Sequence, residues 1–178
     1  MPAPPPTPTP AATPDPTPDP TREPWAAYAT AVVEVTVGDE RFVLTPTAVA
    51  SGTPPGPDTG LPDALRPLWV VTAADPYPQR LTPAQNAARN ARLRAELEGG
   101  GLRVLDALGR APDGSTAEVS LAVTGTDRAT VLAHAADHDQ LAVYEIDDRI
   151  RCVSVDGAHE VTARPYTTSI VRRARRPR

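Results

Sequence analysis

The sequence contains no lysine, a single cysteine and few aromatic residues. Because Cys152 has no possible partner, no intramolecular disulfide can form, and this favours a reducing cytoplasm. We interpret Cys152 as a small packed residue in a strand and not as a reactive thiol. Aromatic residues make up only 4% of the chain against 40% hydrophobic residues, so the core must be built mainly from Val, Leu, Ile and Ala.

Several signatures of membrane proteins and enzymes are also missing. No apolar run approaches the length of a membrane span, and the N-terminus lacks the basic and apolar regions of a signal peptide, so we expect no membrane partner. There is no Gly-x-Ser-x-Gly elbow, and "GTPPGPDTG" lacks the ending of a phosphate-binding loop. These absences predict no catalytic residue, no metal and no cofactor.

The charge is unevenly spread. The net charge is -4, but "VRRARRPR" at the C-terminus carries five arginines, so the remaining chain sums to -9. Nucleic acids are bound by clustered basic side chains, so the acidic body does not favour a nucleic-acid partner. The arginine-rich tail could still contact an anionic partner, and nucleic-acid contact through it stays an alternative.

Composition divides the chain into three parts. Residues 1–24 are nearly half proline, which removes backbone donors and favours a disordered or semi-stiff extension. Residues 25–156 are expected to form one α+β domain. Residues 157–178 are expected to be a flexible basic tail.

Within the domain, hydrophobic periodicity and turn residues predict alternating strands and helices. "YATAVVEVTV", "GDE" and "RFVLTPTAV" read as a β-hairpin, and residues 51–67 as a loop. In residues 117–125, Val119, Leu121 and Val123 alternate with smaller or polar residues, which predicts one apolar face. The other expected strands are 68–74, 102–110, 141–147 and 149–156, and the expected helices are 82–98 and 126–139.

The order of residues 68–147 is therefore strand, helix, strand, strand, helix, strand. This order predicts a ferredoxin-like βαββαβ core with two helices on one face of a sheet. The hairpin adds an N-terminal extension to that sheet, and residues 149–156 add a C-terminal strand.

The helix "LTPAQNAARNARLRAEL" raises a specific question, because Asn86 and Asn90 share a stripe with Leu93 and Leu97. Inward-facing amides need partners, since an unpaired buried amide costs about 1–3 kcal/mol. One interpretation is that they tie a loop and a strand end to the helix. The other is a ligand pocket at the helix N-terminus, with Arg89 adding charge. The candidate binding residues are Asp75, Asn86, Arg89, Asn90 and Gln140.

The same segments resemble an uncharacterised bacterial domain-of-unknown-function family, numbered 3293, over about Tyr28 to Ile146. The resemblance rests on "TAADPYPQRLTPAQNAARNARLRAEL", "ALGRAPDGSTAEVSLAVTG" and "QLAVYE". The matching positions are Thr72, Ala73, Pro76, Asn86, Asn90, Glu118, Ser120, Gln140, Ala142, Val143, Tyr144 and Glu145. The family's Trp-Asn pair is Ala74-Asp75 here, and its aromatic and glycine before the glutamine are His138 and Asp139. The resemblance implies a shared domain and no activity.

Two further pairs of residues have side chains that could bind a metal or act as acid and base. His134 and His138 have a zinc-chelating spacing without an obvious third ligand, so we interpret His138 as a packed or surface histidine. Glu118 and Glu145 could act together only if both faced one cavity.

The sequence thus predicts an uncharacterised cytoplasmic protein, most simply a small binding or regulatory module with a small-molecule or protein ligand. The alternative is an enzyme that uses a polar cluster around Asp75, Asn90 and Glu145. A closed pocket with converging charged groups would favour the enzyme, and an open shallow surface would favour the module.

Overall fold

The computed structural model describes residues 23–47, 60–156 and 160–172. Most of the proline-rich extension, part of the loop expected at 51–67, and the last arginines (residues 173–178) lie outside the described residues. The expectations for those segments therefore remain predictions.

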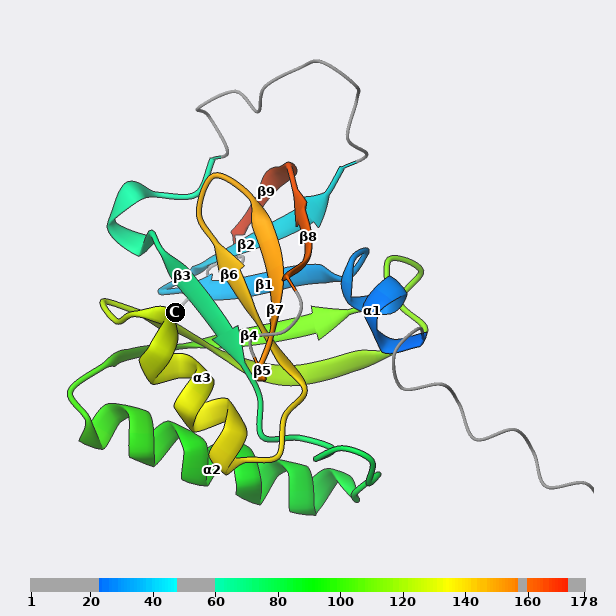
Figure 1. Ribbon diagram of the computed structural model, residues 1–178. Coiled ribbons are helices and arrows are strands. Elements are labelled where there is room, and N and C mark those ends of the chain that lie inside the picture. Colours follow the sequence, from blue (N-terminus) through cyan, green and yellow to red (C-terminus); the bar gives the residue numbers. More distant parts are fainter. Residues whose placement is uncertain (1–22, 48–59, 157–159, 173–178) are drawn as a thin grey trace, which may run out of the picture.

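The described chain is a mixed α/β structure (Figure 1). Its helices are α1 (Glu23–Tyr28), α2 (Pro83–Gly99) and α3 (Arg128–Asp137), with a short 3₁₀ turn at Asp63–Leu65. Its strands are β1 (Val32–Val37), β2 (Glu40–Pro46), β3 (Leu68–Val71), β4 (Arg103–Arg110), β5 (Ala117–Thr124), β6 (Ala142–Ile146), β7 (Ile150–Ser154), β8 (Glu160–Arg164) and β9 (Tyr166–Arg172). The nine strands of the described residues form one sheet in the order β8-β7-β6-β3-β5-β4-β1-β2-β9, and all neighbouring strands pair antiparallel.

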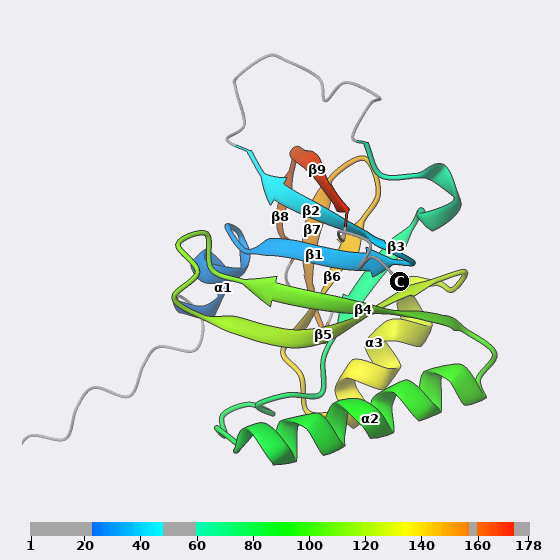
Figure 2. The same ribbon diagram turned by 180° about the vertical axis from the view of Figure 1, so that it is seen from behind.

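The sheet curls on itself. Figures 1 and 2 show β6 and β7 on one side and β1, β2 and β4 on the other. One hydrophobic cluster joins side chains from both ends of the sheet, including Val33, Phe42, Val70, Ile146 and Ile150. Because the two outermost strands, β8 and β9, are consecutive in the chain, the curled sheet brings its edges together around an inner apolar core.

The helices α2 and α3 cover the outer face of the central strands (Figure 1). Trp69 and Val71 of β3 pack there with Leu93 and Leu97 of α2 and Val131 of α3. The central strand order is β6-β3-β5-β4, and β3 runs parallel to β4 because both pair antiparallel with β5 between them. The predicted α+β composition is confirmed, and helices and strands alternate in the expected sequence.

Helix ends agree closely with the sequence signals. The Thr82 hydroxyl accepts from the Gln85 N–H, while the Thr82 N–H donates to the Gln85 side chain at 2.9 Å, which completes a capping box. Asp127 caps α3 by accepting from the Thr130 N–H at 2.8 Å. The predicted N-terminal hairpin is also present as β1 and β2, joined through Gly38 at a φ of 62°.

Two segments differ from the expectation. The structure places β8 and β9 within residues 157–178, where a flexible basic tail was expected. The cause lies in "YTTSIVR", whose β-branched residues pair with β2 from Tyr166 to Arg172, while Arg172 also meets Glu40 at 3.0 Å. At the other end, Glu23–Tyr28 forms a helix that the proline-rich composition had hidden.

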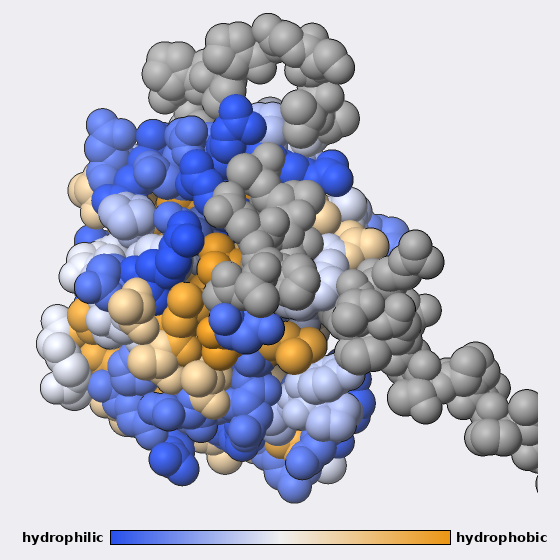
Figure 3. Space-filling model, in the orientation of Figure 1, coloured by the Kyte–Doolittle hydropathy of each residue, from blue (hydrophilic) through white to orange (hydrophobic). Residues whose placement is uncertain are grey.

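The space-filling view shows mainly hydrophilic residues over α2 and a band of apolar side chains across the middle of the same face (Figure 3). Within the described ranges, no helix combines the length and apolar character needed to cross a membrane.

Candidate functional site

Asn90 bridges β3 and β5 just beyond the point where their backbone ladder ends. Its Oδ1 accepts from the Ala73 N–H at 2.7 Å, and its Nδ2 donates to the Val119 carbonyl at 2.8 Å. The Thr72 hydroxyl donates to the same carbonyl at 3.0 Å. Asn90 is only 5% exposed, so its amide needs these partners. Beyond the end of the ladder, the backbones of β3 and β5 no longer bond to each other. The Asn90 amide therefore supplies an acceptor for the Ala73 N–H and a donor for the Val119 carbonyl.

Asn86 and Asp75 form a second tie one helical turn earlier. Asn86 Oδ1 accepts from the Asp75 N–H, and Asn86 Nδ2 donates to Asp75 Oδ1, both at 2.9 Å. The Asp75 carboxylate also accepts from the Leu81 N–H and from Arg80, again at 2.9 Å each. The Leu81 N–H, then Asn86 and Arg80, hold the pKa of Asp75 below its usual value. This carboxylate stays ionised and closes the loop that leads into α2.

Arg89 and Gln140 join the same region from two sides. The Arg89 guanidinium donates to the carbonyls of Ala73 and His138, both at 2.7 Å. The Gln140 amide nitrogen donates to the Ala74 carbonyl at 2.9 Å and to the His138 carbonyl at 3.3 Å. These side chains connect the end of β3, the end of α3 and the start of β6.

The five predicted site residues therefore lie together. We call them, with Thr72, the strand-end network; its members are Thr72, Asp75, Asn86, Arg89, Asn90 and Gln140. Most of their hydrogen bonds engage backbone groups of the departing chain segments. A binding role for these residues stays a prediction.

His138 is packed and not on the surface, which decides between the two predicted placements. Its side chain is 4% exposed, and its Nε2 lies 2.8 Å from Glu96 Oε2, which ties the end of α3 to α2. The bonds from His138 and then Arg92 lower the pKa of Glu96 to about 2. Across the described part of the chain, no three His, Cys, Asp or Glu side chains come together as a possible metal site.

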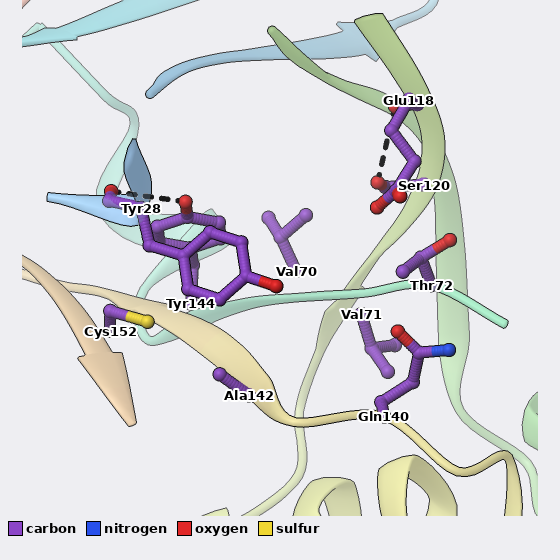
Figure 4. A pocket seen from close by; sticks show the side chains of 10 residues that line it. All are labelled: Tyr28, Val70, Val71, Thr72, Glu118, Ser120, Gln140, Ala142, Tyr144 and Cys152. Carbon is purple, nitrogen blue, oxygen red and sulfur yellow. Dashed lines mark hydrogen bonds between the residues drawn. The ribbon is translucent and has the colours of Figure 1, made fainter. Parts of the chain in front are cut away.

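A hollow opens beside this network on the inner face of the curled sheet, next to α1 (Figure 4). We call it the sheet-mouth hollow. Its empty volume is about 360 Å³, including open solvent at its mouth. Its lining comes from α1, β3, β5, β6, β7 and the residues beside them: Tyr28, Val70, Val71, Thr72, Glu118, Ser120, Gln140, Ala142, Tyr144 and Cys152.

Glu118 is the charged group of the hollow. Burial, followed by the neighbouring charge of Asp75, raises its pKa to about 7, although Arg80 acts in the opposite direction. Among the described residues, the carboxyl has no hydrogen-bond or ion-pair partner. A carboxyl of this kind changes its charge near neutral pH, which is uncommon for glutamate and frequent at functional sites.

Two tyrosines and the cysteine face the same space. Burial raises the pKa of Tyr28 and of Cys152 to about 12, and Glu118 adds to the effect on Tyr28. Burial also raises the pKa of Tyr144, whose hydroxyl donates to the Tyr28 carbonyl at 3.0 Å. All three groups are therefore neutral near pH 7, and of the four ionisable side chains in the lining only Glu118 titrates there. Cys152 is 2% exposed in β7, as its interpretation as a packed strand residue predicted.

The comparisons with known proteins bear on this same segment. Residues 71–143 match the family model described as Protein of unknown function (DUF3293). The predicted resemblance is thereby confirmed, over a shorter range than the expected Tyr28 to Ile146. No curated protein and no solved structure matches the chain. The matched family model carries no stated activity, so the comparisons assign no function.

From its chemistry, Glu118 was predicted as a possible partner of Glu145, and the structure separates the two. Glu145 pairs with Arg128 of α3, on the face covered by helices, while Glu118 lies in the hollow on the inner face. Glu145 also pairs opposite Trp69, six residues before Asp75 in the chain, so the cluster imagined around Asp75, Asn90 and Glu145 is not assembled.

Tyr28 was the residue that sequence reasoning did not find. The available signal was "EPWAAY", in which two aromatic residues follow the proline-rich stretch at helical spacing. Trp25 and Tyr28 pack edge to face with ring centroids 5.9 Å apart, and Tyr28 makes a similar contact with Tyr144 at 6.3 Å.

The two aromatic residues of the central strands that could stack on nucleic-acid bases are not displayed on an open sheet surface. Trp69 is 2% exposed beneath the helices, and the Tyr144 ring lies in the hollow. The remaining route to nucleic acid is the run of arginines at 173–178, which lies outside the described residues.

Proposed function

We propose that this protein is a small-molecule binding module and that its ligand occupies the sheet-mouth hollow. The observation that supports this most is Glu118, a half-buried carboxyl without a partner among the described residues, in a hollow with mixed polar and apolar walls. Unpaired buried charge is costly, and proteins keep it chiefly where a ligand or a reaction uses it. The open end of a curled sheet is also a common place for a ligand.

The positions that carry the family resemblance support the same location. Six of the ten lining residues belong to them: Thr72, Glu118, Ser120, Gln140, Ala142 and Tyr144. In this proposal the strand-end network frames the hollow. Its members Thr72 and Gln140 form part of the wall, while Asn90, Asn86 and Arg89 fix the backbone behind that wall.

The proposal is tested by filling the hollow. Ala142→Leu on β6 adds three carbon atoms to the lining, and Ala88→Leu, exposed on α2, is the matched control. Both variants and the parent protein are screened against a library of small polar fragments by ligand-observed NMR. We expect hits that bind the parent and the control and that Ala142→Leu loses.

Backbone amide spectra locate each hit. Shifts should centre on Glu118, Gln140 and Tyr144. Hits that bind Ala142→Leu as well as the parent, or the absence of any hit on a well-folded parent, would refute the proposed site.

We also propose two finer points. The order β6-β3-β5-β4 with α2 and α3 on one face supports a ferredoxin-like core within the larger sheet. The single buried thiol of Cys152 supports a reducing cytoplasm as the location.

A further inference from the structure

We propose that the sheet-mouth hollow selects a compact primary ammonium on a short apolar body, in preference to an anion or a neutral alcohol. This inference rests on the proposed function and adds the chemical class of the ligand. It follows from which donors and acceptors of the lining are already engaged.

Apart from the Tyr28 hydroxyl, the hydroxyl donors of the lining are committed to the protein. Thr72 donates to the Val119 carbonyl at 3.0 Å, and Ser120 donates to the Glu118 carbonyl at 3.3 Å. Tyr144 donates to the Tyr28 carbonyl at 3.0 Å. A hydroxyl has one hydrogen, so these three groups can offer a ligand only their acceptor lone pairs.

The acceptors, in contrast, are available. The Gln140 nitrogen donates to two backbone carbonyls, and Figure 4 shows its carbonyl oxygen on the side toward the hollow. The Glu118 carboxyl has no partner within the described structure, and the Tyr28 hydroxyl points into the same space (Figure 4). An ammonium has three donors and no acceptor, which complements this set.

The charges around the hollow also favour a cation. Asp75 is compensated by Arg80 at 2.9 Å, and the Arg80 side chain is 88% exposed and directed to solvent. Glu118 is left without an ion-pair partner among the described residues, although Arg80 acts to lower its pKa, while Tyr28, Tyr144 and Cys152 are neutral near pH 7. An anionic ligand would be repelled by Glu118, and the Arg80 charge that also reaches Glu118 is largely exposed and already paired with Asp75.

The apolar part of such a ligand has a matching surface. Val70, Ala142 and Cys152 provide small nonpolar groups, and the rings of Tyr28 and Tyr144 stand nearly perpendicular, at 80°. Tyrosine faces attract cations as well as alkyl groups, so the two rings suit the carbon next to an ammonium.

Three probes of equal carbon length test the inference on the full chain: propylammonium, propanol and propionate. Each is titrated while backbone amide shifts of Glu118 and Gln140 are followed by NMR. We expect propylammonium to bind at least about tenfold more tightly than either other probe, because charge-assisted hydrogen bonds are stronger than neutral ones.

The pH dependence gives a second readout. Only the ionised form of Glu118 pairs with an ammonium. The affinity of the protein for propylammonium should therefore rise about tenfold between about pH 6 and about pH 8. Glu118→Gln should weaken propylammonium binding about tenfold and remove this pH dependence. The control is Glu98→Gln, the same substitution at an exposed position of α2, and it should change neither the affinity nor its pH dependence. Thermal unfolding of both variants verifies that they fold.

The outcomes separate the two proposals. If propanol or propionate shifts the amides of the hollow and propylammonium does not, the ligand class is wrong and the binding site stands. If none of the three shifts these amides, and the fragment screen also finds no hit there, both proposals fail. Equal binding of propylammonium to the parent and to Glu118→Gln likewise overturns the ligand class.

Discussion

The two polar regions on either side of Thr72 contrast sharply in how their hydrogen bonds are used. In the strand-end network, the side chains of Asn90, Asn86 and Arg89 meet backbone groups at 2.7 to 2.9 Å. In the sheet-mouth hollow, Glu118 has no partner in the described structure, and its pKa is raised to about 7. Polar side chains that lie near one another therefore differ in whether the protein itself satisfies them.

The contrast shows how a buried polar residue can be interpreted. A buried amide that satisfies strand ends lowers the cost of leaving those backbone groups in the interior. A buried carboxyl without a partner raises the free energy of the folded state. The strand-end network supports the interpretation that the asparagines tie chain segments together. The hollow is where a ligand would gain the most binding free energy, because it could pair with Glu118.

The largest effect is expected from Asn90→Ala. The substitution leaves the Ala73 N–H and the Val119 carbonyl without their partner, which should lower the free energy of unfolding by about 2–4 kcal/mol. For a chain of this size the midpoint of thermal unfolding should fall by roughly 5–15 °C. Calorimetry at neutral pH measures this change.

The control is Glu98→Ala, an exposed position on the same helix, which should alter stability by less than about 0.5 kcal/mol. An Asn90→Ala protein with unchanged stability and lost ligand binding would reverse the comparison. The amide would then belong to the binding site and not to the structural tie.

A smaller effect of opposite sign is expected from Glu118→Gln. The folded-state pKa of Glu118 lies above its usual value, so the folded protein holds a proton that the unfolded chain has lost. Stability associated with this group is therefore present at acid pH and is lost as pH rises toward 7. Above about pH 8, Glu118→Gln should be more stable than the parent by roughly 1–3 kcal/mol, as measured by urea unfolding.

Glu96→Gln is the matched control, because it is the same substitution at a carboxyl whose pKa is shifted in the opposite direction. The pKa of Glu96 is lowered to about 2 by His138 and Arg92, so its contribution is present above its usual pKa and disappears as pH falls toward 2. Since Glu96 is one-third exposed, the loss should be only about 1 kcal/mol. If both variants change stability in the same direction at pH 8, the electrostatic contrast is incorrect.

The sequence was informative about α2 and about the presence of its amide partners. A proline after Thr82, a glutamine three residues after the cap, and a stripe shared by asparagine and leucine are local signals, and each has a local physical cause. Those signals predicted that Asn90 faces inward, and the structure leaves it 5% exposed. They also predicted that Asp75 and Gln140 lie near the start of the same helix.

The hollow could not be predicted because it depends on the curl of the sheet. In β5, alternation predicted one apolar face containing Val119, yet Val119 is 63% exposed. The opposite side, which reads as small or polar, holds Ser120 and Ala122, and curling turns it into the buried interior. Periodicity assigns residues to faces, but curvature arises from pairings between distant strands, such as β2 with β9.

The smallest effect, and the sharpest test of the comparison, comes from a pair of tyrosines in contact. Tyr144→Phe removes a hydroxyl that donates to the Tyr28 carbonyl, so it should cost about 1 kcal/mol of unfolding free energy. Tyr28→Phe removes a hydroxyl that points into the hollow, so stability should change by less than about 0.5 kcal/mol while propylammonium binding weakens. Urea unfolding and amide titration of both variants measure the two effects. Equal stability losses would show that the Tyr28 hydroxyl is also hydrogen-bonded within the protein. It would then not be available to a ligand, and the contrast between the hollow and the strand-end network would be weaker.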